Sequence, residues 1–146
     1  MTQLSAQQGS ITAPQPSTVS QPYWDAVQRH ELVFQRCLDC QGATHTPSLL
    51  CANCMSRNLK WEKSCGVGTI YSWTVVHRPV TPSFHVPYAP IIVEITEPDG
   101  VKWFVLSALI DCDDSELAVG LNVEVVFTAA SDGLILPYFR PALPMS

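Results

Sequence analysis

The sequence predicts a mainly β protein in which a short helix and a small metal-binding unit precede a five-stranded barrel. Three observations support this fold class. Four cysteines form two Cys-x-x-Cys pairs, β-branched and aromatic runs dominate from residue 65 onward, and turn signals separate those runs. The chain has 146 residues, 47% of them hydrophobic. A chain of that length can form one hydrophobic core and a second, smaller hydrophobic cluster.

The N-terminal part predicts a flexible tail over residues 1–20 and a helix plus metal-binding unit over residues 21–64. The tail has no charged side chain and is rich in Gln, Ser, Thr and Pro, so little apolar burial offsets the entropy of ordering it. Ser20 is a candidate cap and Pro22 suits a first turn, which predicts a helix over residues 22–31. Strands are expected at LVFQR and NLKWEKS.

The cysteine pattern predicts a tetrahedral thiolate site made by Cys37, Cys40, Cys51 and Cys54. No signal peptide is visible, so we expect a cytoplasmic protein, and disulfides are rare in that compartment. Zinc is the expected metal, although iron suits the same four sulfurs. Four protein ligands leave no position for water or substrate, so the predicted role of the zinc is structural.

Residues 65–146 predict a barrel. Five short strands and one short helical segment, in the order of three strands, helix and two strands, are typical of an OB-fold. A β-sandwich is the alternative, but it usually needs about seven strands. The expected strands are GTIYSWTVVHR, PIIVEITE, VKWFVLSALI, LNVEVVFTA and LILPYFRP.

Charge argues against nucleic-acid binding, which zinc ribbons and OB-folds both support in other proteins. Residues 65–146 carry three basic and nine acidic side chains, a net charge of −6. A polyanion requires a positive surface, because phosphate contacts supply most of the non-specific affinity. The longest apolar runs are also far shorter than the roughly 20 residues of a membrane-spanning helix. We therefore expect neither nucleic acid nor membrane as a partner.

An enzyme with its own nucleophile is a further alternative, since Cys65, Cys112, His77 and His85 lie outside the metal site. Cys65 is better interpreted as a small core residue at a strand start. Three neighbouring aspartates would raise the pKa of Cys112 and suppress its thiolate. The sequence therefore predicts no catalytic residue on this chain.

Two proline-rich aromatic segments predict a partner interface. HRPVTPSFHVPYAP has few polar residues for a solvated loop, and LPYFRP places aromatic side chains beside an arginine. The alternative is that these aromatics pack on the barrel itself. The expected interface residues are Phe84, Tyr88, Tyr138, Phe139 and Arg140.

Several of these segments, in this order, resemble the acyl-CoA-associated zinc-ribbon plus OB-fold family. They are YWDAVQRHELVFQRCLDCQGATHTPSLLCANC, GVGTIYSWTVVHRP, VPYAPIIVEI and GLILPYFRPA. The resemblance covers residues 22–142 and implies a rubredoxin-like zinc ribbon followed by the barrel. It departs from the family at Ser48, where many relatives carry an arginine, so it places no CoA phosphate there.

The resemblance implies a non-catalytic scaffolding subunit of a thiolase-fold acyltransferase or aldolase complex. Such a subunit bridges thiolase-like or ketosynthase-like enzymes in a hetero-oligomer and can line the acyl substrate channel. Family members occur with steroid side-chain aldolases, with enzymes of early mevalonate synthesis and, in secondary metabolism, with the C-acetyltransferase that makes diacetylphloroglucinol. The alternatives are an acyl-CoA-binding module of a hydratase or steroid aldolase complex and, less favoured, a single-stranded nucleic-acid-binding OB-fold.

Overall fold

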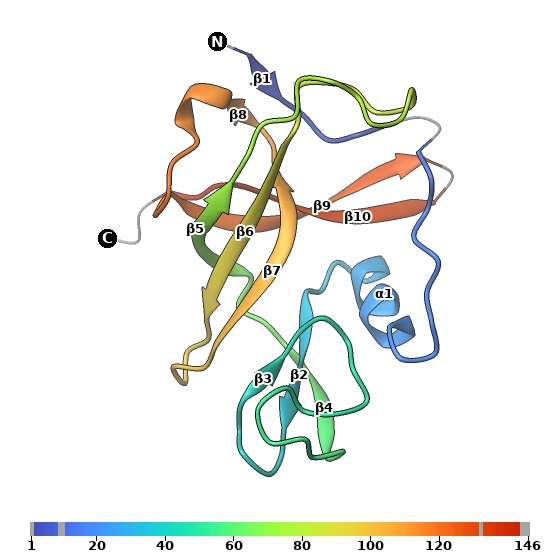
Figure 1. Ribbon diagram of the computed structural model, residues 1–146, viewed down its shortest axis with the longest axis vertical. Coiled ribbons are helices and arrows are strands. Elements are labelled where there is room, and N and C mark those ends of the chain that lie inside the picture. Colours follow the sequence, from blue (N-terminus) through green and yellow to red (C-terminus); the bar gives the residue numbers. More distant parts are fainter. Residues whose placement is uncertain (1, 9–10, 132, 144–146) are drawn as a thin grey trace.

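The computed structural model describes residues 2–8, 11–131 and 133–143 (Figure 1). Within them the chain folds into three sheets, one α-helix and one 3-10 helix, which confirms the mainly β prediction. In chain order the elements are β1 Gln3–Leu4, α1 Gln21–Gln28, β2 Val33–Cys37, β3 Ala43–Thr44, β4 Leu59–Lys63, β5 Val67–Trp73, β6 Ala89–Thr96, β7 Lys102–Leu109, β8 Cys112–Asp113, η1 Asp114–Glu116, β9 Asn122–Ser131 and β10 Leu134–Pro141.

The ribbon is a three-stranded antiparallel sheet in the order β3-β2-β4. Its central strand β2 is buried along its whole length and ends on Cys37, which pairs with Leu59 of β4. Both strands predicted here are therefore present. Because β2 is held on both sides, the first cysteine pair leaves the sheet from a fixed position.

The barrel is closed, in the order β10-β7-β6-β5-β9. Antiparallel pairing joins all neighbours except β10 and β7, which meet in parallel register at Phe139 and Leu109. The five predicted barrel strands are thus confirmed. The first ends earlier than expected, at Trp73, and the chain continues as a loop to Tyr88 with one bridge between Val76 and Tyr88.

One continuous core joins the ribbon, the helix and the barrel. Along β6, buried side chains alternate with half-exposed ones, as a sheet with one face on the core requires. Phe34 of β2 stacks on Trp103 of β7 with ring centroids 5.3 Å apart, and Val27 of α1 belongs to the same cluster. The ribbon therefore shares apolar burial with the barrel instead of standing as a separate unit.

Helix α1 is shorter than predicted. It begins next to Pro22 and ends at Gln28, because His30 takes a left-handed φ of 61°. The hydroxyl of Ser20 does not cap the helix and instead bonds to Ser17. No described helix has the length and apolar character that a bilayer crossing requires.

The described part of the N-terminal tail packs on the barrel, in contrast to the flexible tail that composition predicts. Strand β1 pairs antiparallel with β8, and Leu4 is fully buried. Gln7 is also buried, and its side-chain amide donates to the carbonyl oxygen of His85 at 2.9 Å and accepts from the His85 amide at 2.8 Å. One leucine and one glutamine thus order a segment of otherwise polar composition.

Candidate metal centre and neighbouring surfaces

The four predicted metal ligands come together at one end of the ribbon. The sulfur atoms of Cys37, Cys40, Cys51 and Cys54 all lie within 4.8 Å of one another. Two of the separations, Cys37 to Cys54 and Cys40 to Cys51, are 3.6 Å. Four sulfurs at about 2.3 Å from a tetrahedral ion would be roughly 3.8 Å apart. The cluster therefore has the dimensions of a four-thiolate metal site.

The two cysteine pairs have the same local geometry. In each, the amide after the second cysteine bonds at 3.0 Å to the carbonyl of the first, and that residue, Gln41 or Met55, has a φ of 65°. The amide of Ala52 donates to Thr44 Oγ1 at 3.0 Å and ties the second turn to β3. Sequence spacing thus dictates two similar turns, and the sheet brings them face to face.

Backbone amides prepare two of the four sulfurs, those of Cys37 and Cys51, for a cation. The Cys40 and Asp39 amides donate to the sulfur of Cys37, each at 3.4 Å, and lower its pKa. The amides of Cys54 and Asn53 likewise lower the pKa of Cys51 to about 6. The sulfurs of Cys40 and Cys54 also accept a backbone amide each, from Gly42 and Ser56, but desolvation and the neighbouring thiols raise their pKa. Thiolates are the metal-binding form of cysteine. The donor set therefore fits a divalent ion such as zinc and leaves no ligand position open for chemistry.

A buried carboxylate joins the ribbon to the barrel, a feature that sequence reasoning missed. Glu97, which follows β6, is 4% exposed. It accepts hydrogen bonds from Ser64 Oγ at 2.6 Å, from Trp103 Nε1 at 2.8 Å and from the Cys65 amide at 2.9 Å. These bonds fix the segment that connects β4 to β5. In the sequence, the only signal is an acidic residue at the end of a predicted strand, directly before a turn.

Arg36 makes a second polar connection across the same junction. It is 5% exposed, and its guanidinium contacts Glu62 of β4 at 2.7 Å and Asp99 of the β6–β7 turn at 2.8 Å. Burial alone would lower the pKa of Arg36, but the Glu62 hydrogen bond and the charges of Glu62 and Asp99 outweigh it, so the pKa is raised. The side chain is therefore a permanent cation that holds the barrel turn against the ribbon.

The predicted interface residues do not form one surface. Phe139 has no exposed area and belongs to the core, so its assignment to the interface is wrong. Its position on β10 turns the ring into the closed barrel. Tyr138 is 7% exposed, and its hydroxyl accepts from the Gln7 amide at 3.1 Å. Phe84 and Tyr88 are half-buried in the loop with ring centroids 5.4 Å apart, and Arg140 is exposed beside Glu124.

The two remaining cysteines are not arranged as nucleophiles. Partial desolvation of the thiol and the charge of Glu97 raise the pKa of Cys65, whose thiol lies against the carbonyls of Val67 and Thr96. Cys65 is exposed, contrary to the prediction of a core residue. Burial, followed by the charges of Glu116 and the neighbouring aspartates, raises the pKa of Cys112 to about 11. At neutral pH both side chains are therefore thiols.

A groove of about 420 Å³ lies where α1, the ribbon and the barrel meet. Helix α1 and the ribbon supply Tyr23, Trp24 and Pro47 to its lining, and the barrel supplies Leu106 and Pro137. His45 also lines it, and its Nδ1 atom is buried without a hydrogen-bond partner within the described residues. Burial lowers the pKa of His45 to about 4, so the imidazole is neutral at pH 7. The groove is thus mainly apolar, and none of its lining residues is charged at pH 7.

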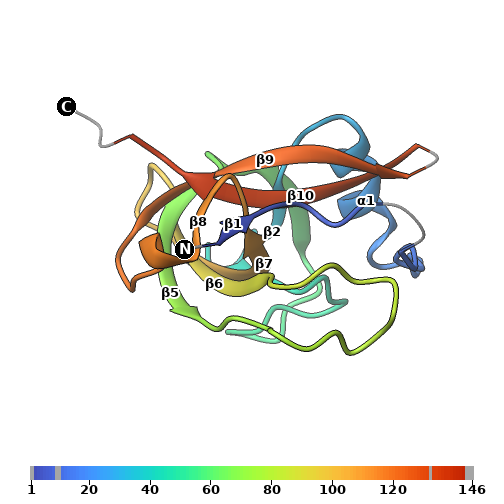
Figure 2. The same cartoon turned by 90° about the horizontal axis from the view of Figure 1, so that it is seen from above.

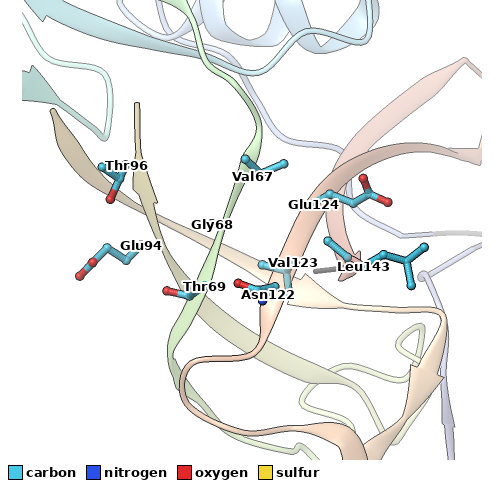
Figure 3. A pocket seen from close by; sticks show the side chains of 10 residues that line it. Val67, Gly68, Thr69, Glu94, Thr96, Asn122, Val123, Glu124 and Leu143 are labelled. Atoms are coloured by element: carbon cyan, nitrogen blue, oxygen red, sulfur yellow. The ribbon is translucent and has the colours of Figure 1, made fainter. Parts of the chain in front are cut away.

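A larger hollow of about 630 Å³ lies at the start of β5, beside the C-terminal residues Ala142 and Leu143 (Figure 3). Figure 3 shows Glu94 on one side and Glu124 on the other, and these carboxylates pair with Lys102 at 3.7 Å and Arg140 at 2.9 Å. Gly68 in its wall permits the close approach of β5 to β6, since a Cβ there would meet the Glu94 carbonyl oxygen at 2.3 Å. Both carboxylates at this hollow are therefore already paired with a cation.

Comparison with known families matches both structural units. A model of the rubredoxin-like zinc ribbon domain of ChsH2 matches residues 24–60, and a model of the ChsH2 C-terminal OB-fold domain matches residues 61–128. The chain belongs to the ChsH2-type zinc-ribbon and OB-fold family. The resemblance drawn from the sequence motifs is thereby confirmed.

Relatives in this family carry scaffold and enzyme-subunit descriptions. A DUF35 domain-containing scaffold protein of Methanothermobacter thermautotrophicus is 34% identical over 120 residues, covering 77% of this chain and 86% of the relative. A probable enoyl-CoA hydratase alpha subunit of Thermomonospora curvata is 31% identical over 145 residues, 98% of this chain and 44% of the relative. This chain therefore spans less than half of that hydratase subunit.

A solved structure described as an Ltp2-ChsH2(DUF35) aldolase is similar to the whole ribbon-and-barrel unit. Its TM-score is 0.76 at 28% identity, and the match covers 89% of this chain and 99% of that chain. The 3-oxo-4,17-pregnadiene-20-carboxyl-CoA hydratase alpha subunit of Mycobacterium tuberculosis is 32% identical over 118 residues, covering 81% of this chain but 36% of the relative. ChsH2-type units thus occur in hydratase and aldolase complexes.

Proposed function

We propose that this chain is a non-catalytic scaffolding subunit of an acyl-processing complex, with a thiolase-fold acyltransferase or aldolase as its partner. One observation carries the proposal: the four clustered thiols complete a closed metal site, while the pKa values of both remaining cysteines are raised. A thiolase-type reaction needs an activated nucleophile and acid/base groups. In this proposal the partner supplies them, and zinc supplies folding energy to the ribbon.

The relatives support an assembly role. Scaffold proteins of similar size match most of their length to this chain, whereas the hydratase subunits carry the matching unit within a chain more than twice as long. A ribbon-and-barrel unit found both alone and inside larger subunits is expected to bind an enzyme rather than to act as one. The thiolase-like or ketosynthase-like nature of that enzyme is part of our proposal.

The test is purification of the native complex, identification of the co-purifying subunits by mass spectrometry, and reconstitution from separately expressed chains. We expect the isolated chain to release no thiol from acyl-CoA, and the reconstituted complex to be active. Turnover by this chain alone would contradict the scaffold role. Failure of any thiolase-fold enzyme to co-purify, with a hydratase-like subunit in its place, would identify the other class of complex.

An acyl-CoA-binding module of a hydratase or steroid aldolase complex is the second candidate. The apolar groove beside His45 favours it, because apolar walls suit the acyl portion of such a ligand. The position of the family arginine, however, is occupied by Ser48, whose amide and carbonyl are both bonded to the side chain of Gln35 at 2.8 and 2.9 Å. Calorimetric titration of the isolated chain with an acyl-CoA separates the two candidates, since only the binding module should produce heat.

A further inference from the structure

The outer face of the barrel strands β5, β6 and β7 carries an apolar surface that sequence reasoning missed. We define it by Tyr71, Ile92, Phe104 and Leu106. Tyr71 is 56% exposed, Phe104 44% and Leu106 73%. The rings of Tyr71 and Phe104 meet at 5.0 Å, and Ile92 pairs directly with Leu106 across the sheet. The four side chains are therefore contiguous.

This outer sheet face continues into the junction groove, because Leu106 belongs to both. Figure 1 shows β5, β6 and β7 in front of β9 and β10, and Figure 2 shows the loop after β5 on that same side of the barrel. With 150–250 Å² for a large apolar side chain, the exposed part of the face amounts to roughly 300 Å². A patch of that size is comparable to the largest apolar patch on a typical monomer, which is often functional, and here an apolar groove extends it.

We propose that the outer sheet face and the adjoining groove form the docking surface for the partner enzyme subunit, an inference that rests on the proposed function. A standard interface buries about 800 Å² on each side, with an apolar centre and a polar rim. The face supplies such a centre. Glu94 and Lys102 lie beside Phe104 at its edge, joined at 3.7 Å.

Charge favours an enzyme subunit over a second copy of this chain. Residues 65–146 have a net charge of −6, so two barrels placed face to face would repel each other. A partner with basic groups around an apolar recess would be complementary. The barrel is closed, so strand addition at an edge is not open to a partner, and recognition depends on side chains.

The same charge argues against single-stranded nucleic acid, for which exposed aromatic side chains on an OB-fold sheet would otherwise be a stacking platform. Lys102 is the one cation described next to the face, and it is paired with Glu94. An oligonucleotide would have no phosphate ligands there beyond this lysine. The pair formed by Tyr71 and Phe104 is therefore better suited to contact a protein surface than to stack on a nucleic-acid base.

The experiment compares Leu106→Glu with Val119→Glu in the full chain, using as probe the enzyme subunit that co-purifies with wild type. Leu106 and Val119 are 73% and 71% exposed, so each change adds a charge to a solvated apolar side chain without opening the core. We expect Leu106→Glu to raise the Kd at least tenfold and Val119→Glu to change it less than twofold, with both melting temperatures near wild type. Tyr71→Ser provides a second variant and should also weaken binding.

Radical footprinting of free and bound wild type should show protection of Tyr71 and Phe104. If the enzyme binds Leu106→Glu and Tyr71→Ser at full affinity and the aromatic rings stay labelled, the surface assignment is wrong while the proposed function stands. If wild type binds no enzyme subunit, both the surface assignment and the proposed function are wrong. Dimerisation of the chain alone through Leu106, or protection of the rings by a 20-residue oligothymidine, would also overturn the assignment.

Discussion

Replacing Glu97 by alanine should loosen the ribbon from the barrel. The carboxylate accepts three hydrogen bonds, from Ser64, Trp103 and the Cys65 amide, at 2.6 to 2.9 Å. Ser64 is 8% exposed and Trp103 3%. Each bond to a charged group contributes about 1.5–3 kcal/mol, and a buried donor left alone costs about 1–3 kcal/mol. Because such terms are not additive, we expect a loss of about 3 to 5 kcal/mol in the free energy of unfolding.

The assay is urea denaturation of the metal-loaded chain, with unfolding monitored by far-ultraviolet circular dichroism and by tryptophan fluorescence. Glu94→Ala is the matched control. It removes a carboxylate from β6 that is paired with Lys102 at 3.7 Å near the surface, so it should cost less than about 1 kcal/mol. If Glu97→Ala costs no more than the Glu94 control, the Glu97 hydrogen bonds do not hold the two parts together, and the account of the junction fails.

Three further outcomes follow from the contacts described. Cys51→Ser should lower bound zinc from about one ion per chain to near zero by elemental analysis, whereas Cys65→Ser should leave it unchanged; full metal content in the first variant would refute the proposed ligand set. Burial lowers the pKa of His45 from 6.5 to about 4 in the folded chain, so protonation of the imidazole favours the unfolded chain. The neutral imidazole therefore contributes roughly 3 kcal/mol to the free energy of unfolding. This contribution is complete above pH 6.5 and is lost as the pH falls toward 4. His45→Phe should therefore unfold with a flatter pH dependence over that range in denaturation series, and an unchanged slope would mean that another group titrates. Gln7→Ala should speed hydrogen exchange at the His85 amide at least tenfold by NMR, because it removes the acceptor of that amide at 2.8 Å, and unchanged protection would show that the loop is held otherwise.

The features that sequence alone predicted are those with a local cause. Each Cys-x-x-Cys pair specifies its own turn, and the barrel strands follow from β-branched and aromatic runs such as the one on β6. Both patterns are contained in a few consecutive residues. The ribbon, the succession of barrel strands along the chain and the four-thiol cluster could therefore be inferred from the sequence.

The features that sequence missed depend on contacts between distant segments. Glu97 meets Ser64 from 33 residues away, and Leu4 is covered only because β1 pairs with β8. Phe139 lies in a segment that resembles an exposed aromatic anchor, yet barrel closure in register with Leu109 turns it inward. No local pattern encodes which strand closes the barrel, so no local pattern separates a core aromatic from a docking one.

The junction around Glu97 and Arg36 has a mechanical consequence. Three contacts connect the ribbon to the barrel: the stack of Phe34 on Trp103, the Glu97 hydrogen bonds and the ion pair of Arg36 with Asp99. Together they prevent the ribbon from rotating relative to the barrel. Two enzyme subunits bound at opposite ends of such a rigid unit would be held at a fixed distance and in a fixed relative orientation. In the proposed complex, the dimensions of this chain would then determine how far an intermediate must travel between two active sites.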